Sequence, residues 1–242
     1  MSNIDRVIIT GASSGIGLDF AKQLFSKGSK IVINGRDEAK LAAVAESFGD
    51  PERIEAVAGG VDDPSTATRL IEAARRRFDG VDLLVNNAGI FEVKPLLDST
   101  VEDLERFFET NVKGTYMVTQ AVVPSMIQQG GGAIINVGSV LVDQPMVSTP
   151  VSAAMASKGG VHALTRSFAA ELSPYNIRVN ALAPGIVRTP LIGDAADSLA
   201  EIHPLKTIAE VSDTSDALLY LAKAPFVTGA ILNLDGGYSN AR

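Results

Sequence analysis

Seven short apolar runs rich in β-branched residues recur along the chain, and longer amphipathic stretches separate them. The apolar runs occupy residues 6–10, 30–34, 53–58, 82–86, 133–137, 177–182 and 230–234. The amphipathic stretches occupy residues 15–27, 37–48, 65–78, 100–128, 151–173 and 213–223. Continuous apolar runs are typical of strands that are covered on both faces. The alternation predicts an α/β fold, in which a doubly wound, seven-stranded parallel sheet carries helices on both faces.

Composition narrows the class of protein. The chain has 242 residues, of which 46% are hydrophobic, so we expect one domain that spans residues 1–242. It has no apolar run long enough to cross a membrane and no secretory signal pattern, so we expect no membrane partner and a cytoplasmic location. The net charge of −7 argues against a nucleic-acid partner. The absence of cysteine and the presence of only two histidines, His162 and His203, argue against a metal site.

The segment TGASSGIG, residues 10–17, follows the first predicted strand and opens the first predicted helix. Gly11 allows a tight turn, Gly15 lets a phosphate approach the backbone, and Gly17 lets the helix pack closely on the sheet. The free N–H groups and the positive dipole end of the helix then suit a pyrophosphate. We therefore predict a Rossmann-type dinucleotide site, with a ligand-free tight turn as the alternative. The residues expected at the dinucleotide are Gly11, Ser13, Ser14, Gly15, Ile16 and Gly17.

Further motifs follow in order along the chain. They are NNAG at 86–89, NVKG at 111–114, NVGS at 136–139, SKGG at 157–160, PGIVRT at 184–189 and VTGAILNLDGG at 227–237. Together with the glycine turn, this set resembles the short-chain dehydrogenase/reductase family in its short single-domain branch, over nearly the whole chain. The resemblance implies an NAD(P)-dependent oxidoreductase that transfers a hydride between the nicotinamide and a small carbonyl or alcohol. It also implies cofactor contacts from Val61, Asn87, Ala88, Gly89, Lys158, Pro184, Gly185, Val187 and Thr189.

The end of the second predicted strand bears on which dinucleotide is bound. An acidic residue there would bind the ribose hydroxyls of NAD, whereas Arg36 offers a guanidinium that can hold the 2′-phosphate of NADP. Asp37 either repels that phosphate or caps the next helix, and Arg36 is alternatively a solvated surface charge. We expect NADP(H) to be favoured over NAD(H). After the third strand, Gly60 stands where the family often has an acidic residue for the adenine.

Four residues cooperate in the family's catalytic centre, and three of them match here. By resemblance, Ser139 holds the substrate oxygen, Lys158 binds the nicotinamide ribose, and Asn111 supports a water and the lysine. The fourth is a tyrosine four residues before the lysine, whose ammonium lowers the tyrosine pKa from about 10. In this chain that position is Ala154. The segment from Ser139 to Lys158 is also longer than is usual in the family, so we expect a rebuilt loop between them.

Several groups are candidates to replace the missing proton donor. Ser152, Ser157 and Asp143 lie near the gap in sequence, and each is alternatively a helix cap or a solvated surface group. His203 lies in the expected substrate loop, and Lys158 can donate directly or through water. Because a positioned general acid contributes about 10²–10⁴-fold, losing the tyrosine weakens the step without abolishing it.

Three interpretations remain open at this point. The chain is a reductase with a substitute proton donor, a member of the family that binds a dinucleotide or small molecule with little chemistry, or an ordinary enzyme in which Ala154 was engineered. Retention of the serine, the lysine and the asparagine favours an oxidoreductase of impaired activity.

Two regions bear on substrate and assembly. Residues 190–205 are the expected substrate lid, and Glu92, Met146 and Leu191 either line the pocket or belong to the ordinary surface. The apolar faces of stretches 100–128 and 151–173 exceed what sheet packing needs. Because family members commonly pair these helices between subunits, we expect a homotetramer, or failing that a dimer.

Overall fold

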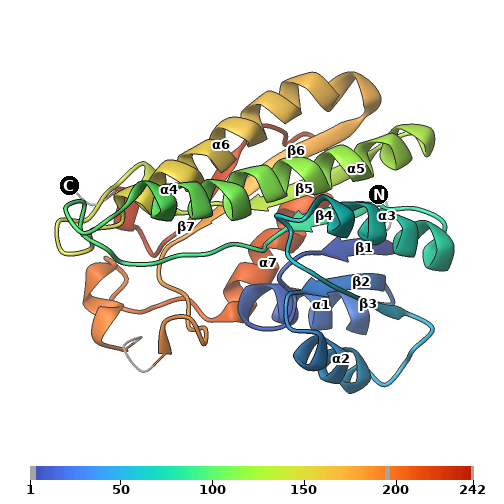
Figure 1. Ribbon diagram of the computed structural model, residues 1–242, viewed down its shortest axis with the longest axis horizontal. Coiled ribbons are helices and arrows are strands. Elements are labelled where there is room, and N and C mark those ends of the chain that lie inside the picture. Colours follow the sequence, from blue (N-terminus) through green and yellow to red (C-terminus); the bar gives the residue numbers. More distant parts are fainter. Residues whose placement is uncertain (1–3, 194–196, 241–242) are drawn as a thin grey trace.

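A computed structural model describes residues 4–193 and 197–240. In this part of the chain, seven parallel strands form one sheet in the order β3-β2-β1-β4-β5-β6-β7 (Figure 1). The strands are β1 (Arg6–Ile9), β2 (Lys30–Gly35), β3 (Ile54–Ala58), β4 (Leu83–Asn86), β5 (Gly132–Val137), β6 (Ile177–Pro184) and β7 (Ile231–Leu234). The expected doubly wound sheet is confirmed. The strand order reverses between β1 and β4, which opens a crevice at the carboxyl ends of these strands.

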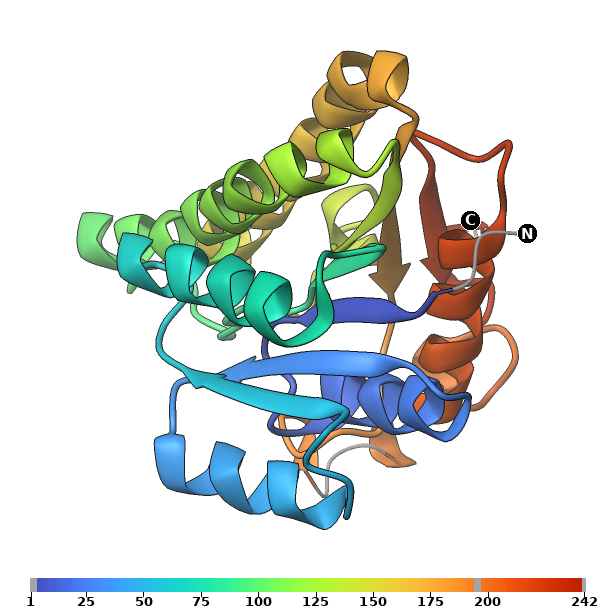
Figure 2. The same ribbon diagram turned by 90° about the vertical axis from the view of Figure 1, so that its right-hand side faces the viewer.

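Helices cover both faces of the sheet (Figure 2). On one face lie α3 (Pro64–Phe78), α5 (Gly114–Gln128) and α6 (Ser152–Leu172). On the other face lie α1 (Gly15–Ser26), α2 (Glu38–Ser47) and α7 (Val211–Lys223). Each strand of the centre therefore needs apolar side chains on both sides, which explains why the sequence shows continuous rather than alternating apolar runs.

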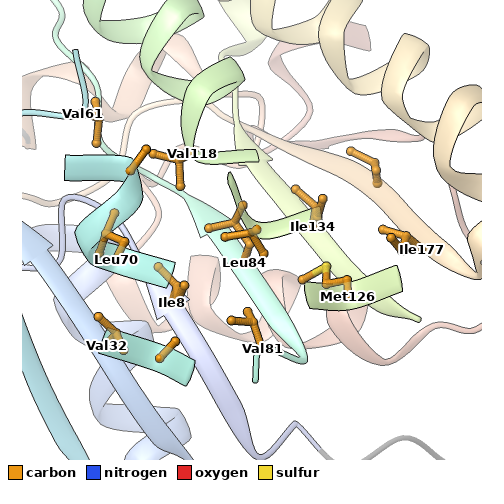
Figure 3. Close-up of a cluster of buried hydrophobic side chains, with 14 of the residues drawn as sticks. Ile8, Val32, Val61, Leu70, Val81, Leu84, Val118, Met126, Ile134 and Ile177 are labelled. Atoms are coloured by element: carbon orange, nitrogen blue, oxygen red, sulfur yellow. The ribbon is translucent and has the colours of Figure 1, made fainter. Parts of the chain in front are cut away.

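The core on the α3, α5 and α6 face is drawn in Figure 3. Ile8, Leu84 and Ile134 come from neighbouring strands and are fully buried against Val118 and Met126 of α5. Burial of these apolar side chains stabilises the fold, and their close packing holds α5 and α6 at a fixed position against the sheet.

The predicted helix over 100–128 is interrupted. It begins as α4 (Val101–Phe107), where Thr100 and Asp103 form a capping box, and continues as a π-helix, η1 (Phe108–Lys113), before α5. A π turn has one more residue per turn than an α turn, so it rotates the residues that follow it. In η1 this wide turn places Asn111 inward, with 1% of its surface exposed.

Short helical turns follow the carboxyl ends of strands: η2 (Val140–Val142), η5 (Asp197–Ile202) and η6 (Tyr238–Asn240). Another turn, η3 (Ser173–Tyr175), ends α6 and precedes the amino end of β6. The expected lid over 190–205 contains η5, which is orange in Figure 1, while residues 194–196 lie outside the described residues. Among the described residues, no helix is both long and apolar enough to span a membrane.

Candidate active site

One cavity of about 630 Å³ runs along the carboxyl ends of the strands. It reaches from Arg36, at the end of β2, past the glycine turn to Ser139, after β5, and to the lid. Almost every cofactor residue expected from the sequence lines it: Gly11, Ser13, Ser14, Gly15, Ile16, Arg36, Val61, Asn87, Ala88, Gly89, Lys158, Pro184, Gly185, Val187 and Thr189. The exception is Gly17, which is buried under the turn.

The glycine turn has the shape that a phosphate needs. Gly11 has φ of 64° and Gly15 has φ of 56°, which are left-handed conformations that favour glycine. A Cβ on Gly17 would lie 2.5 Å from Nδ2 of Asn87, so the position accepts no side chain. The Ser14 side chain makes no capping hydrogen bond to α1, which leaves the N–H groups of its first turn for an anion.

Asn87 fastens the NNAG segment to this turn. Its Nδ2 donates to the carbonyl oxygens of Thr10 at 3.0 Å and Gly11 at 2.9 Å. The Thr10 hydroxyl in turn accepts from the backbone N–H groups of Asn87 and Ala88, both at 3.0 Å. These bonds join the ends of β1 and β4, so the crevice between them has a fixed width.

The adenosine end of the cavity is lined by Arg36, Val61 and Asp62. Asp37 is turned away from it, because the Asp37 carboxylate accepts from the backbone N–H of Lys40 at 2.9 Å and caps α2. The Arg36 side chain is exposed and forms no hydrogen bond or ion pair with any other described residue. Its guanidinium is therefore available to a ligand, and the helix cap is the role that the structure gives to Asp37.

Lys158 is fixed at the floor of the cavity. Its Nζ donates to the carbonyl oxygen of Val137, at the end of β5, at 2.7 Å. A Cβ on Gly89 would lie 3.1 Å from this Nζ, so the NNAG segment passes directly over the ammonium. Burial lowers the pKa of Lys158 from 10.5 to about 8.

Asn111 supports the same region from behind the wall and does not line the cavity. Its Oδ1 accepts from the N–H of Ile90 at 2.9 Å, and its Nδ2 donates to the Ile90 carbonyl at 3.1 Å. Nδ2 also lies 2.8 Å from Oγ of Ser157, whose hydroxyl donates to the carbonyl of Ala154 at 2.7 Å. Asn111 thus ties the chain after β4 to the first turns of α6.

Ser139 lies in the cavity wall after β5. It begins η2, and its Oγ accepts from the N–H of Leu141 at 3.3 Å. The hydroxyl proton remains for a ligand. The buried ring of His162 lies beneath Gly138, where a Cβ would collide with it, and this ring keeps the backbone before Ser139 in place.

Ala154 does not reach the cavity. Its side chain is 1% exposed and packs with Phe107 and Val151, against which Phe91 and Leu141 also lie. From the first turns of α6, the residues that line the cavity are instead Met155 and Lys158. Phe91, Leu141 and Met155, which pack around Ala154, themselves line the cavity, so Ala154 lies behind this wall.

Three of the proposed donors, Asp143, Ser152 and Ser157, do not line the cavity. The Ser157 hydroxyl is already bonded to Asn111 and Ala154, and Asp143 and Ser152 are exposed outside the cavity wall.

Of the residues expected to line the substrate pocket, Glu92 lies outside the wall, where it pairs with Arg106. Met146 and Leu191 line the cavity as expected.

His203 lines the cavity and is 3% exposed. Its Nε2 accepts from the N–H of Ile186 at 3.3 Å, its Nδ1 is buried without a partner among the described residues, and burial lowers its pKa. Tyr238 also lines the cavity, a position that the sequence analysis missed. The Tyr238 hydroxyl donates to the carbonyl oxygen of Gln144 at 3.1 Å, and burial raises its pKa. Its place after β7, at the same sheet edge as Ser139, was the available signal.

The residues present fit a nicotinamide dinucleotide. A phosphate cradle that excludes side chains lies between Arg36 at one end and Ser139 with Lys158 at the other, in one continuous cavity. This is the order in which such a ligand presents its adenosine, pyrophosphate and nicotinamide.

Comparison with known proteins agrees with this assignment. The family model for short chain dehydrogenases matches residues 5–199. Cyclopentanol dehydrogenase of Comamonas sp. (strain NCIMB 9872) is 35% identical over 243 residues, covering 96% of each chain. Galactitol 2-dehydrogenase (L-tagatose-forming) of Cereibacter sphaeroides is 34% identical over 242 residues, covering 96% of this chain and 93% of that one.

A solved structure shows the same arrangement over the whole chain. L-Sorbose reductase from Gluconobacter frateurii, complexed with NADPH and L-sorbose, is 29% identical and superposes with a TM-score of 0.92, covering 100% of this chain and 99% of that one. The family and the fold that the motifs predicted are therefore confirmed, and the chain belongs to the short-chain dehydrogenase/reductase family of oxidoreductases.

Proposed function

We propose that the protein is an NADP(H)-dependent reductase of small carbonyl compounds, or dehydrogenase of the corresponding alcohols, in which proton transfer is weakened by Ala154. The observation that carries the proposal is that Ser139 and Lys158 line the same cavity as the phosphate cradle, while position 154 does not reach it. The part of the site that orients hydride transfer is kept, and the part that supplies the proton is changed.

The preference for NADP(H) rests on Arg36. Its guanidinium has no partner among the described residues, and the neighbouring carboxylate of Asp37 is engaged in the cap of α2. A guanidinium at this strand end holds a 2′-phosphate with charge-assisted hydrogen bonds. Asp62, in the same part of the wall, is the one described acidic side chain that would oppose it.

The residues divide the reaction between them. When bound, the reduced nicotinamide supplies a hydride to the carbonyl carbon. The Ser139 hydroxyl donates to the carbonyl oxygen and holds it beside Lys158. Lys158 then gives its proton to the developing alkoxide, directly or through one water, and returns to the neutral amine. A pKa near 8 keeps this lysine mostly protonated at neutral pH yet ready to release the proton.

Lys158 is favoured over the remaining groups by its partners. Tyr238 lines the cavity, but its hydroxyl is committed to the carbonyl oxygen of Gln144. His203 accepts from Ile186 through Nε2 and keeps a buried Nδ1 without a partner among the described residues, and burial lowers its pKa, which makes it a less protonated acid than Lys158. One proton of the Lys158 ammonium is used on Val137, which leaves two others.

The test separates cofactor binding from chemistry. NADPH fluorescence measures binding, and stopped-flow absorbance follows oxidation of NADPH by a panel of ketones and aldehydes. We expect micromolar or tighter binding, slow turnover, and loss of turnover in Lys158→Met. Lys113→Met, at an exposed lysine paired with Glu109, is the matched control and should be unaffected. Failure to bind NADPH would overturn the proposal.

A second candidate function is a dinucleotide-binding protein with no turnover. It is favoured by the alanine at position 154, whose methyl group lies among apolar side chains and cannot supply a proton. Tight NADPH binding without oxidation by any carbonyl compound would establish it.

We also propose that the protein forms a homotetramer, with a dimer as the smaller alternative. Large apolar side chains stay exposed along the helical segment from α4 to α5: Leu104, Phe108, Tyr116 and Ile127. Such a row on a helix surface is typical of a subunit contact.

A further inference from the structure

The charged side chains of the cavity are distributed unevenly. Of the described residues that line it, Arg36, Asp62 and Lys158 carry charge at neutral pH. Arg36 and Asp62 follow β2 and β3, at the adenosine end, and Lys158 lies beneath the NNAG segment. All three are therefore in the part of the cavity assigned to the dinucleotide.

The part beyond Ser139 is lined by apolar side chains from four separate segments. They are Phe91 after β4, Leu141 and Met146 in the loop after β5, Met155 on α6, and Leu191 and Ile202 in the lid. Convergence of four segments on one apolar wall makes this a shaped surface for a ligand, since pockets for small molecules are mostly apolar with a few placed polar groups.

The polar groups in this part are few. The Tyr238 hydroxyl is bonded to Gln144, and Nε2 of His203 to Ile186. Ser139, Ser148 and Thr149 provide the remaining hydroxyls, and the buried Nδ1 of His203 has no partner among the described residues. These groups can orient a carbonyl oxygen, but they are too few for a molecule that carries a hydroxyl group on nearly every carbon.

The mouth of the cavity is apolar as well. Val93 and Leu191 both line the cavity, yet they remain 53% and 69% exposed. Apolar side chains that stay in water at the rim of a pocket favour a ligand that covers them.

From these observations we infer that the substrate is an uncharged, predominantly apolar ketone or its alcohol, an inference that rests on the proposed function. A carboxylate in this part would be removed from water without a cationic partner, because among the described lining residues the nearest cation is Lys158, which the proposed reaction places at the carbonyl oxygen rather than at the far end of the substrate. We expect this to weaken binding by about 100-fold or more.

The test compares ketones of one shape. 4-Methylcyclohexanone and 4-oxocyclohexanecarboxylate differ chiefly in charge, and a ketohexose serves as the polyhydroxylated comparison. Binding to the complex of the protein with NADP⁺ is measured by the shift in thermal unfolding, and kcat/KM is measured separately with NADPH. We expect 4-methylcyclohexanone to bind about 100-fold more tightly than either of the other two ketones, and to have a kcat/KM about 100-fold higher.

A pair of adjacent residues supplies the matched variants. Met146 lines the cavity, whereas the neighbouring Val147 is fully exposed and outside the wall. Met146→Lys should lower kcat/KM for 4-methylcyclohexanone by about tenfold or more and raise binding of 4-oxocyclohexanecarboxylate. Val147→Lys should leave both substrates unchanged, and both variants should keep the affinity for NADPH.

The outcomes distinguish this inference from the proposed function. Equal or better binding of the carboxylate or the ketohexose would overturn the inference while leaving the reductase intact. Binding of 4-methylcyclohexanone without turnover would support the inference and overturn the proposed function. If none of the three ketones shifts unfolding of the NADP⁺ complex, the apolar assignment is wrong.

Discussion

The Nζ of Lys158 donates to the carbonyl oxygen of Val137 at 2.7 Å, which joins α6 to the end of β5. The bond holds the ammonium in place, but no carboxylate among the described residues pairs with it, so one carbonyl dipole offsets only part of the penalty of burial. The pKa of about 8 is the result, and it makes the lysine both a usable acid and a source of instability.

The first prediction concerns the pH dependence of the reaction. In the proposed mechanism carbonyl reduction requires the protonated lysine, so kcat should be level at lower pH and fall as pH rises through about 8. Alcohol oxidation requires the neutral amine and should rise through the same pH. Rates measured from pH 6 to pH 10 in both directions test this, and a reduction rate that stays level above pH 9 would contradict it.

The second prediction concerns stability. The folded protein releases the Lys158 proton near pH 8, whereas the unfolded chain holds it up to about 10.5, so the unfolded state binds more protons in between. The free energy of unfolding should therefore gain up to about 3 kcal/mol from this group as pH rises from 8 to 10.5. Denaturant titrations at both pH values should show this gain in the wild-type protein and not in Lys158→Met.

The third prediction concerns Ala154→Tyr. A phenol added at a 1% exposed position among Phe107, Val151 and Leu141 overfills the cluster, and should cost about 1–3 kcal/mol of stability. Because this position does not face the cavity, we expect less than the 100-fold gain in turnover that a restored general acid would give. Stopped-flow rates and urea unfolding check both parts, and a gain above 100-fold would show that the loop opens to admit the ring.

The fourth prediction concerns cofactor choice. Arg36→Ala removes a charge-assisted hydrogen-bonding partner of the 2′-phosphate, which is equivalent to about 1.5–3 kcal/mol, or about 10–100-fold in Kd for NADPH. The Kd for NADH should be unchanged and serves as the internal control. An equal loss of affinity for NADPH and NADH would show that the Arg36 guanidinium does not bind the 2′-phosphate.

The fifth prediction concerns Asn111. Asn111→Leu leaves both the N–H and the carbonyl of Ile90 without their partner, so we expect a loss of about 2–4 kcal/mol in the free energy of unfolding. Glu109→Ala, at an exposed position of the same π turn, should change stability by less than about 1 kcal/mol. Thermal and urea unfolding of the two variants decide the matter.

Much of this architecture could be predicted from the sequence, because the strands are short, apolar and regularly separated by helices. The glycine turn and the Lys158 position followed from motifs whose local conformation needs particular residues, such as Gly11 and Gly15 with positive φ. These features are local, so a single chain reveals them.

The environment of Ala154 could not be predicted in the same way. It depends on how the loop after Ser139 packs against Phe91 and Phe107, which are far away in sequence. The π turn at Phe108–Lys113 likewise occurs together with bonds of Asn111 to Ile90, which lies 21 residues earlier, and nothing in the sequence indicated this contact. Tyr238 was missed because its role arises only when β7 brings the end of the chain beside the loop at Gln144.

The separation of roles between Arg36 and Asp37 has a consequence for how such a protein changes over time. Arg36 lines the cavity and bonds to no other described residue, while Asp37 holds the start of α2 and does not line the cavity. With the role proposed for Arg36, coenzyme preference is a modular trait. Replacing the residue at position 36 then changes which coenzyme the protein uses, and no second substitution is needed to restore the stability of the fold.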